Sequence, residues 1–141
     1  MRAIFTTKDG SVCLGISAEG GWVAEVRGAR IDLERREAFR ALLPVLEEEP
    51  RDVTELLNAA IQEHDLAAFP VEELILHALE FASSYWKELA LAWLESAPRW
   101  SPALAERLEA IGAKGSKWPQ PMRHKVQKLL RAHAGRAASR K

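Results

Sequence analysis

The hydrophobic pattern of the chain changes its period near residue 31. Before this point, runs of β-forming residues alternate with turn residues, and the runs are Ala3–Thr7, Val12–Ile16 and Trp22–Arg27. The Asp9-Gly10 pair between the first two runs is typical of a tight hairpin turn. These features predict a small antiparallel β meander over residues 1–31. Because such a sheet is marginal in isolation, we expect it to pack on helices.

From Asp32 onward, apolar residues recur with the spacing of a helix. Asp32 is a candidate N-cap, and Pro44 is expected to kink or split the first helix because proline has no backbone N–H. A second helix is predicted to start at Asp52, where Glu55 completes a capping box. Further helices are predicted from about residues 71, 85, 102 and 121, the third of these with Ser101 as its N-cap. Gly112 is expected to close that helix.

The predicted fold class is α+β, mostly α, with five to six short helices after the meander. Two successive helices take roughly 33–36 residues, close to the length of known helix-pair repeats. The helical part, residues 32–135, therefore packs either as a HEAT-like right-handed α-solenoid or as an irregular bundle, and both packings remain open. We expect residues 1–135 to form a single domain, with Gly135 ending the last helix and residues 136–141 forming a disordered basic tail.

Composition favours a soluble protein of the cytoplasm. Hydrophobic residues make up 48% of the 141 residues, which is enough for a sizeable core, and charged residues make up 28%. No apolar run reaches the ~18–20 residues needed to cross a bilayer, and the N-terminus has no long apolar segment typical of a signal peptide. Cys13 is the single cysteine, so an intrachain disulfide is excluded. A reducing compartment and no membrane association are the simplest interpretation.

Charge is distributed unevenly along the chain, although its net value is zero. Glu109 is the last acidic residue, and residues 110–141 contain nine basic residues and no acidic one. Residues 1–109 contain the remaining 11 basic residues and all 20 acidic ones, a net charge of −9. The basic end either faces a polyanion or an acidic partner, or it neutralises the acidic body within the same fold. Both interpretations remain open.

Two apolar helical stretches carry a resemblance to a known group of proteins. They are Tyr85-Trp86-Lys87-Glu88-Leu89-Ala90-Leu91-Ala92-Trp93-Leu94 and Met122-Arg123-His124-Lys125-Val126-Gln127-Lys128-Leu129-Leu130. Over residues 70–134 the chain resembles bacterial proteins with HEAT-like helical repeats, some of which are similar to immunity proteins that neutralise the toxins of neighbouring bacteria. The resemblance implies a helical-repeat fold and a role in protein binding. It carries no functional residue over to this chain.

Residues that perform chemistry show no catalytic or metal-binding spacing. The four histidines include no pair at i, i+4, the spacing of a helical zinc site, and Cys13 has no partner close in sequence. The loop that contains Lys114, Gly115 and Lys117 could bind an anion with its backbone N–H groups, or it could be a solvated turn after a helix. We therefore expect no enzymatic activity, no metal and no cofactor.

Aromatic and basic residues near the C-terminus are the candidate binding surface. Trp100 and Trp118 stand in polar links, where each tryptophan either contacts a partner or fastens its loop onto a helix end. The candidate partner-binding residues are Trp100, Trp118, Arg123, Lys125, Lys128 and Arg131. They predict a non-enzymatic protein-interaction module, of an immunity or regulatory type. The alternative is a nucleic-acid-associated protein that uses the basic last helix, although the isoelectric point of about 6.9 is low for that class.

Overall fold

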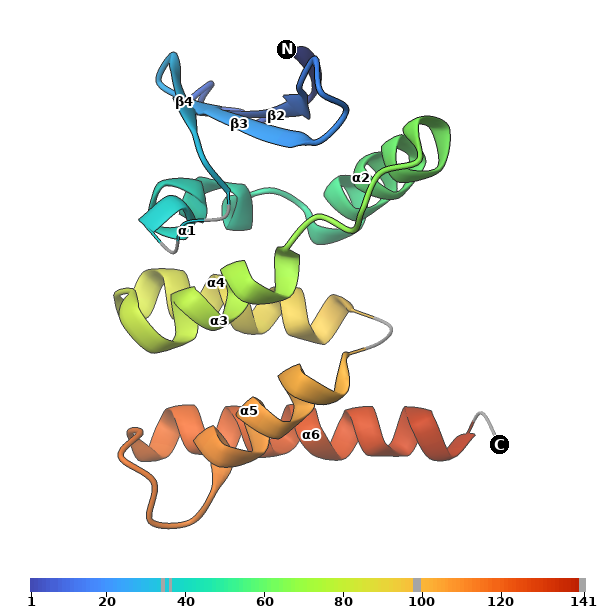
Figure 1. Ribbon diagram of the computed structural model, residues 1–141. Coiled ribbons are helices and arrows are strands. Elements are labelled where there is room, and N and C mark those ends of the chain that lie inside the picture. Colours follow the sequence, from blue (N-terminus) through green and yellow to red (C-terminus); the bar gives the residue numbers. More distant parts are fainter. Residues whose placement is uncertain (34, 36, 98–99, 140–141) are drawn as a thin grey trace. The chain divides into compact units, whose positions relative to one another are not determined.

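The computed structural model describes residues 1–33, 35, 37–97 and 100–139, and it divides into two compact units (Figure 1). Unit 1 is Met1–Ala90 and unit 2 is Leu91–Lys141. Over the described residues, a four-stranded sheet is followed by six α-helices and one short 3-10 helix. The predicted fold class, mostly α with a small N-terminal sheet, is confirmed. A single domain over residues 1–135, and its packing as a solenoid or a bundle, stay predictions.

The sheet is the predicted meander. Its strands are β1 (Arg2–Thr6), β2 (Val12–Ile16), β3 (Trp22–Val26) and β4 (Ala29–Ile31), paired antiparallel in chain order. The Asp9 carboxylate accepts hydrogen bonds from the Thr7 hydroxyl at 2.8 Å and from the Ser11 N–H at 2.9 Å, which fixes the first turn. Arg27 and Gly28 form the last turn with φ of 52° and 82°. Two positive φ values give the two-residue turn whose twist matches that of the flanking strands.

Proline sets two helix boundaries in unit 1. Its helices are α1 (Glu37–Leu42), the 3-10 helix η1 (Leu43–Glu47), α2 (Pro50–His64), α3 (Val71–Phe81) and the first part of α4 (Ser84–Ser96). The predicted split at Pro44 is confirmed, because α1 ends and η1 begins just before it. The predicted start at Asp52 is wrong: α2 begins two residues earlier at Pro50, whose fixed φ suits a first helical position. Asp52 therefore lies in the first turn and forms no capping box.

The predicted N-cap at Asp32 is also wrong. The Asp32 carbonyl accepts a hydrogen bond from the Arg35 N–H at 3.3 Å, so this residue opens a turn, and α1 begins only at Glu37. A second turn follows directly, because the Arg35 carbonyl accepts from the Ala38 N–H at 3.1 Å. Residues 34 and 36 lie outside the described residues.

The sheet of unit 1 packs on α2 and on the connection that follows it. Ile16 of β2 is buried together with Ala60 of α2 and Leu66, which follows that helix. The Trp22 indole N–H donates to the Ala67 carbonyl at 2.8 Å, and the Trp22 ring lies edge-on to Phe69 at 5.4 Å. The expectation that the meander packs on helices is thus confirmed.

Unit 2 consists of the end of α4, then α5 (Pro102–Gly112) and α6 (Gln120–Ser139). The Ser101 hydroxyl accepts a hydrogen bond from the Leu104 N–H at 3.1 Å, so the predicted N-cap of α5 is confirmed. Gly112 is the last residue of α5, but the C-cap is Ala113 in an extended conformation, not a left-handed glycine. A Cβ at Gly112 would lie 3.3 Å from the Gln127 side chain. The missing side chain therefore serves the close approach of α5 and α6.

The last helix is longer than predicted. α6 continues through Gly135 to Ser139, so the predicted end at Gly135 is wrong. A glycine inside a helix costs about 1 kcal/mol relative to alanine, which weakens the helix there without stopping it. Residues 136–139 of the predicted tail are therefore helical, and residues 140–141 lie outside the described residues.

Candidate functional site

The boundary between the two units also separates the acidic part of the chain from the basic part. Unit 2 contains 11 basic and 3 acidic residues, a net charge of +8. Unit 1 contains 9 basic and 17 acidic residues, a net charge of −8. Two compact units of opposite charge therefore cancel to a net charge of zero.

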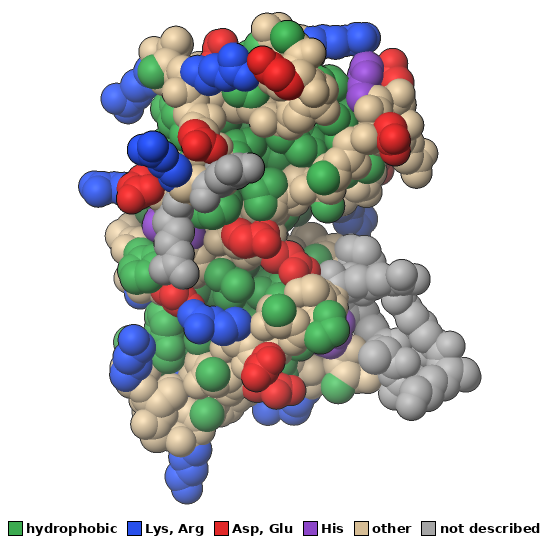
Figure 2. Space-filling view, in the orientation of Figure 1, with side chains coloured by type: hydrophobic (Ala, Val, Ile, Leu, Met, Phe, Trp, Pro, Cys, Tyr) green, Lys and Arg blue, Asp and Glu red, His purple; other side chains and the backbone are tan. Residues whose placement is uncertain are grey.

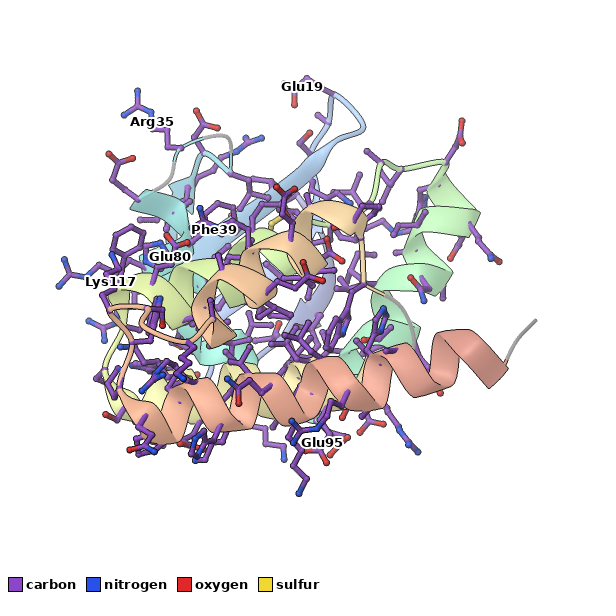
Figure 3. All side chains as sticks on the ribbon, turned by 90° about the horizontal axis from the view of Figure 1, so that it is seen from below. Glu19, Arg35, Phe39, Glu80, Glu95 and Lys117 are labelled. Carbon is purple, nitrogen blue, oxygen red and sulfur yellow. The ribbon has the colours of Figure 1, made fainter. Side chains whose placement is uncertain are left out.

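The long helix α6 separates apolar from basic side chains. Val126 is fully buried, and partly buried residues lie on the same side of the helix: Met122, Leu129, Leu130 and His133. His124, Lys128 and Arg131 are exposed and follow one another at i, i+4 and i+7, so they lie on the opposite side. Lys125 is exposed at the edge of that side. We call His124, Lys125, Lys128 and Arg131 the basic face of α6; Figure 3 shows nitrogen-bearing side chains along this helix.

Arg123 has a different role from the neighbouring lysines. Its side-chain Nε donates to the Trp118 carbonyl at 3.1 Å, and the residue is partly buried. This hydrogen bond holds the loop before α6 against the first turn of the helix. Arg123 is therefore outside the basic face, whereas Lys125, Lys128 and Arg131 from the same prediction lie together on it.

Trp100 is not an exposed contact residue. Its exposed fraction is 7%, and its indole N–H donates to the Leu94 carbonyl at 3.2 Å. Its ring stacks on that of His133 with centroids 4.2 Å apart and planes 4° apart. Trp100 therefore fastens the α4–α5 link onto α6, the second of the two roles considered for it. Trp118 is partly buried, so its side chain is only partly available to a partner.

His133 is a structural residue that the sequence search missed. It lies on the apolar side of α6, where its ring stacks on that of Trp100. The available signal was its position seven residues after Val126, two helical turns along the same stripe. Its Nδ1 is buried and has no hydrogen-bond partner among the described residues.

The loop between α5 and α6 keeps its lysines at the surface. Lys114, Gly115 and Lys117 are exposed, and Gly115 has a φ of 82°. The Ser116 N–H donates to the Ala113 carbonyl at 3.1 Å and the Ser116 hydroxyl donates to the Ile111 carbonyl at 2.9 Å. One backbone donor of the loop is thus used within the turn. An anion site here stays a prediction, carried by the two lysines.

No group of three or more histidine, cysteine or acidic residues in the described ranges could hold a metal ion. None of the helices described is both long and apolar enough to cross a membrane. Cys13 is partly buried in β2 and carries a free thiol.

Comparisons of this chain with protein-family models, with curated proteins and with solved structures found no match. The resemblance to HEAT-like repeat proteins therefore stays a prediction.

Proposed function

We propose that this chain is a non-enzymatic protein-binding module whose unit 2 binds an acidic partner protein through the basic face of α6. The observation that carries the proposal is the separation of buried apolar side chains from exposed basic side chains around α6. Val126 packs inside unit 2, while Lys125, Lys128 and Arg131 remain exposed on the outer sides. No catalytic step is part of the proposal.

The helix that carries the basic face, residues 120–139, contains no aspartate or glutamate. The three acidic residues of unit 2 are Glu95, Glu106 and Glu109, which precede α6 in the chain. A cationic surface of this kind steers an acidic partner toward it and disfavours basic partners. Arg131 adds geometric specificity, because a guanidinium group can bind a carboxylate through two parallel hydrogen bonds.

An immunity-type role is one form of this proposal. In that form the chain binds an acidic surface of a toxin and covers its active region. The role is supported by the resemblance of residues 70–134 to HEAT-like proteins and by nothing further in the fold.

A second candidate function, nucleic-acid binding, is favoured by one observation. Residues 110–141 hold nine basic residues and no acidic one, the electrostatic footprint of a phosphate-binding helix. The acidic unit 1, with a net charge of −8, would repel a long polyanion unless it faces away from it. A compact acidic surface on a protein meets less of this repulsion, which is why protein binding is placed first.

The full-length chain, immobilised and exposed to a lysate of its own source cells with and without nuclease, tests the proposal. We expect a protein partner that is retained after nuclease treatment and released as salt screens the charges. Recovery of nucleic acid alone would replace the proposal with the second candidate. In that case the logarithm of the binding constant should fall linearly with the logarithm of salt concentration, by about 0.7–0.9 per phosphate contact.

A pair of variants assigns the binding to α6. Lys128→Glu with Arg131→Glu reverses two charges of the basic face, and we expect affinity to fall about tenfold or more. Arg2→Glu with Arg51→Glu is the matched control, because it makes the same charge change at exposed positions of unit 1. Equal losses in the two double variants would show that net charge, and not the basic face, attracts the partner.

A further inference from the structure

A second surface of different chemistry lies on unit 1, where three rings form a row. Phe39 of α1 lies 6.3 Å from His77 of α3, and His77 lies 5.3 Å from Phe81 at the end of α3. Phe81 is 69% exposed, the largest value among the large hydrophobic residues described. Hydrophobic side chains also reach the surface between charged ones in Figure 2. The row therefore presents an apolar ring at the surface, with one neighbouring ring, that of His77, beside it.

The ring of His77 behaves as part of this aromatic row. Burial, and then the positive charge of Arg40, lowers the pKa of His77 below its ordinary value of 6.5. The lowered pKa favours the uncharged imidazole at neutral pH. The uncharged form of this ring adds no charge of its own beside the exposed phenyl group, and the cation that acts on it is Arg40.

A second exposed ring lies in the first turn of α4, just after the short link from α3. Tyr85 is 56% exposed, and its hydroxyl donates to the Glu47 carboxylate at 2.6 Å. Its ring lies edge-on to Trp86 with centroids 5.0 Å apart. Tyr85 follows Phe81 by four residues, so the two Cα atoms are at most about 14 Å apart. We call Phe81 and Tyr85, with Glu47, the aromatic–acidic surface of unit 1.

The segments that carry this surface are acidic. Residues 37–49 and 77–88 hold six acidic residues and two basic ones, Arg40 and Lys87. Glu47 and Glu49 are exposed, whereas Glu48 is buried and accepts a hydrogen bond from the Lys8 N–H. Exposed rings attract a cation through their negative faces, and carboxylates beside them attract it further. A guanidinium group suits such a surface better than an ammonium group, because it is planar, stacks on rings and pairs with carboxylates through two hydrogen bonds.

We propose that the aromatic–acidic surface of unit 1 binds an arginine-rich segment of a partner protein. One arginine stacks on Phe81, whose ring is already oriented by His77. Another arginine lies over Tyr85 and pairs with the Glu47 carboxylate. The binding is separate from that proposed for α6, since it uses another unit and a partner of opposite charge.

The test uses the full-length chain and a fluorescein-labelled peptide of alternating arginine and glycine, with its lysine–glycine counterpart as the second probe. Fluorescence anisotropy at physiological salt gives the dissociation constants. We expect the arginine peptide to bind more tightly than the lysine peptide. Phe81→Ala should weaken binding of the arginine peptide about two- to fivefold, and Phe81→Ala with Tyr85→Ala about five- to twentyfold.

Leu56→Ala is the matched control, because Leu56 is a 45% exposed apolar residue of α2 in the same unit. It should leave the affinity for the arginine peptide unchanged. Circular dichroism of each variant confirms that the fold is retained, which is expected because the substituted side chains are exposed.

Three outcomes would overturn the proposal. The first is no binding of the arginine peptide to the wild-type chain. The second is equal affinity for the wild type and the Phe81→Ala, Tyr85→Ala variant, which would reduce the attraction to net charge. The third is self-association of the wild-type chain, seen by sedimentation and lost in the double variant, which would make a second copy the occupant of this surface.

Discussion

Unit 1 and unit 2 differ in charge, in architecture and in what their surfaces offer. Unit 1 has a net charge of −8, a sheet packed on a helix, and exposed rings beside carboxylates. Unit 2 has a net charge of +8, helices alone, and a long helix with lysine and arginine on its outer side. The net charge of the whole chain hides this contrast, because the charges of the two units cancel. Under the two proposals above, the units bind partners of opposite charge.

The two units are also stabilised differently. In unit 1, residues far apart in sequence meet, as where Trp22 of β3 hydrogen-bonds to the carbonyl of Ala67 after α2. In unit 2, α5 packs against α6 at Gly112, where Gln127 donates to the Gly112 carbonyl at 2.6 Å. The side chains of α6 are described over residues 120–135, and among these Val126 alone is buried. In unit 2, α6 is therefore held by one fully buried side chain and by the partly buried ones beside it.

Among the substitutions proposed here, Leu108→Ala is expected to cause the largest loss in the free energy of unfolding. Leu108 of α5 is fully buried, and removing most of its side chain should lower the free energy of unfolding by about 2–5 kcal/mol. Urea denaturation followed by tryptophan fluorescence measures the change. Leu56→Ala, at an exposed position, should change the same quantity by no more than about 0.5 kcal/mol. A loss below about 1 kcal/mol for Leu108→Ala would contradict the core assigned to unit 2.

Gly15→Ala tests the sheet of unit 1 and should have the next largest effect. A Cβ at Gly15 would lie 2.4 Å from the Arg2 carbonyl oxygen and 2.8 Å from the Met1 Cγ, so β1 must move away from β2. We expect a loss of about 1–3 kcal/mol in the free energy of unfolding. Gly21→Ala is the control, because a Cβ there meets no atom within 4 Å. Equal stability of the two variants would contradict the close pairing of β1 and β2.

Ser101→Ala removes the N-cap of α5 and should have a smaller effect. The Leu104 N–H loses its hydroxyl acceptor, and helix caps of this kind contribute about 1 kcal/mol. Ser101→Asp retains an acceptor and should keep most of the stability. The same urea denaturation measures both variants. If Ser101→Asp were as unstable as Ser101→Ala, the loss could not be assigned to the cap.

The smallest effect is the pH dependence that Tyr85, the single tyrosine of the chain, gives to the stability. Its hydrogen bond to Glu47, then burial and the negative charge of Glu47, raises its pKa above the ordinary value of 10.0. Because the folded pKa is the higher one, the stabilisation is present below pH 10.0 and is lost as pH rises through the folded pKa. Titration of tyrosinate absorbance should give a midpoint above 10.0, and Glu47→Ala should lower it. Glu49→Ala, at a neighbouring exposed residue, should lower it less.

Local signals in the sequence were enough to predict much of the fold. Ser101 before Pro102, Pro44 within an apolar stripe and the turn at Asp9-Gly10 each act within a few residues. Two local signals compete at residues 50–52, and the fixed φ of Pro50 starts the helix before Asp52. At Gly135 the sequence signal fails because glycine weakens a helix without ending it.

The candidate sites depended on contacts that lie further apart. Trp100 is buried by His133, which is 33 residues away, so its polar neighbours gave no sign of its burial. The lysines of α6 could be placed on one face from helical spacing alone. The row of rings on unit 1 joins α1 to α3, and no pattern within either helix shows that Phe81 remains exposed.

One measurement tests whether the division of charge is a division of function. The affinities of two double variants are measured at physiological salt for the captured acidic partner and for the arginine–glycine peptide. Lys128→Glu with Arg131→Glu should lose about tenfold or more toward the acidic partner and keep its affinity for the peptide within about twofold. Phe81→Ala with Tyr85→Ala should lose affinity for the arginine–glycine peptide and keep its affinity for the acidic partner. Parallel losses toward both ligands, in either variant, would contradict two separate binding surfaces.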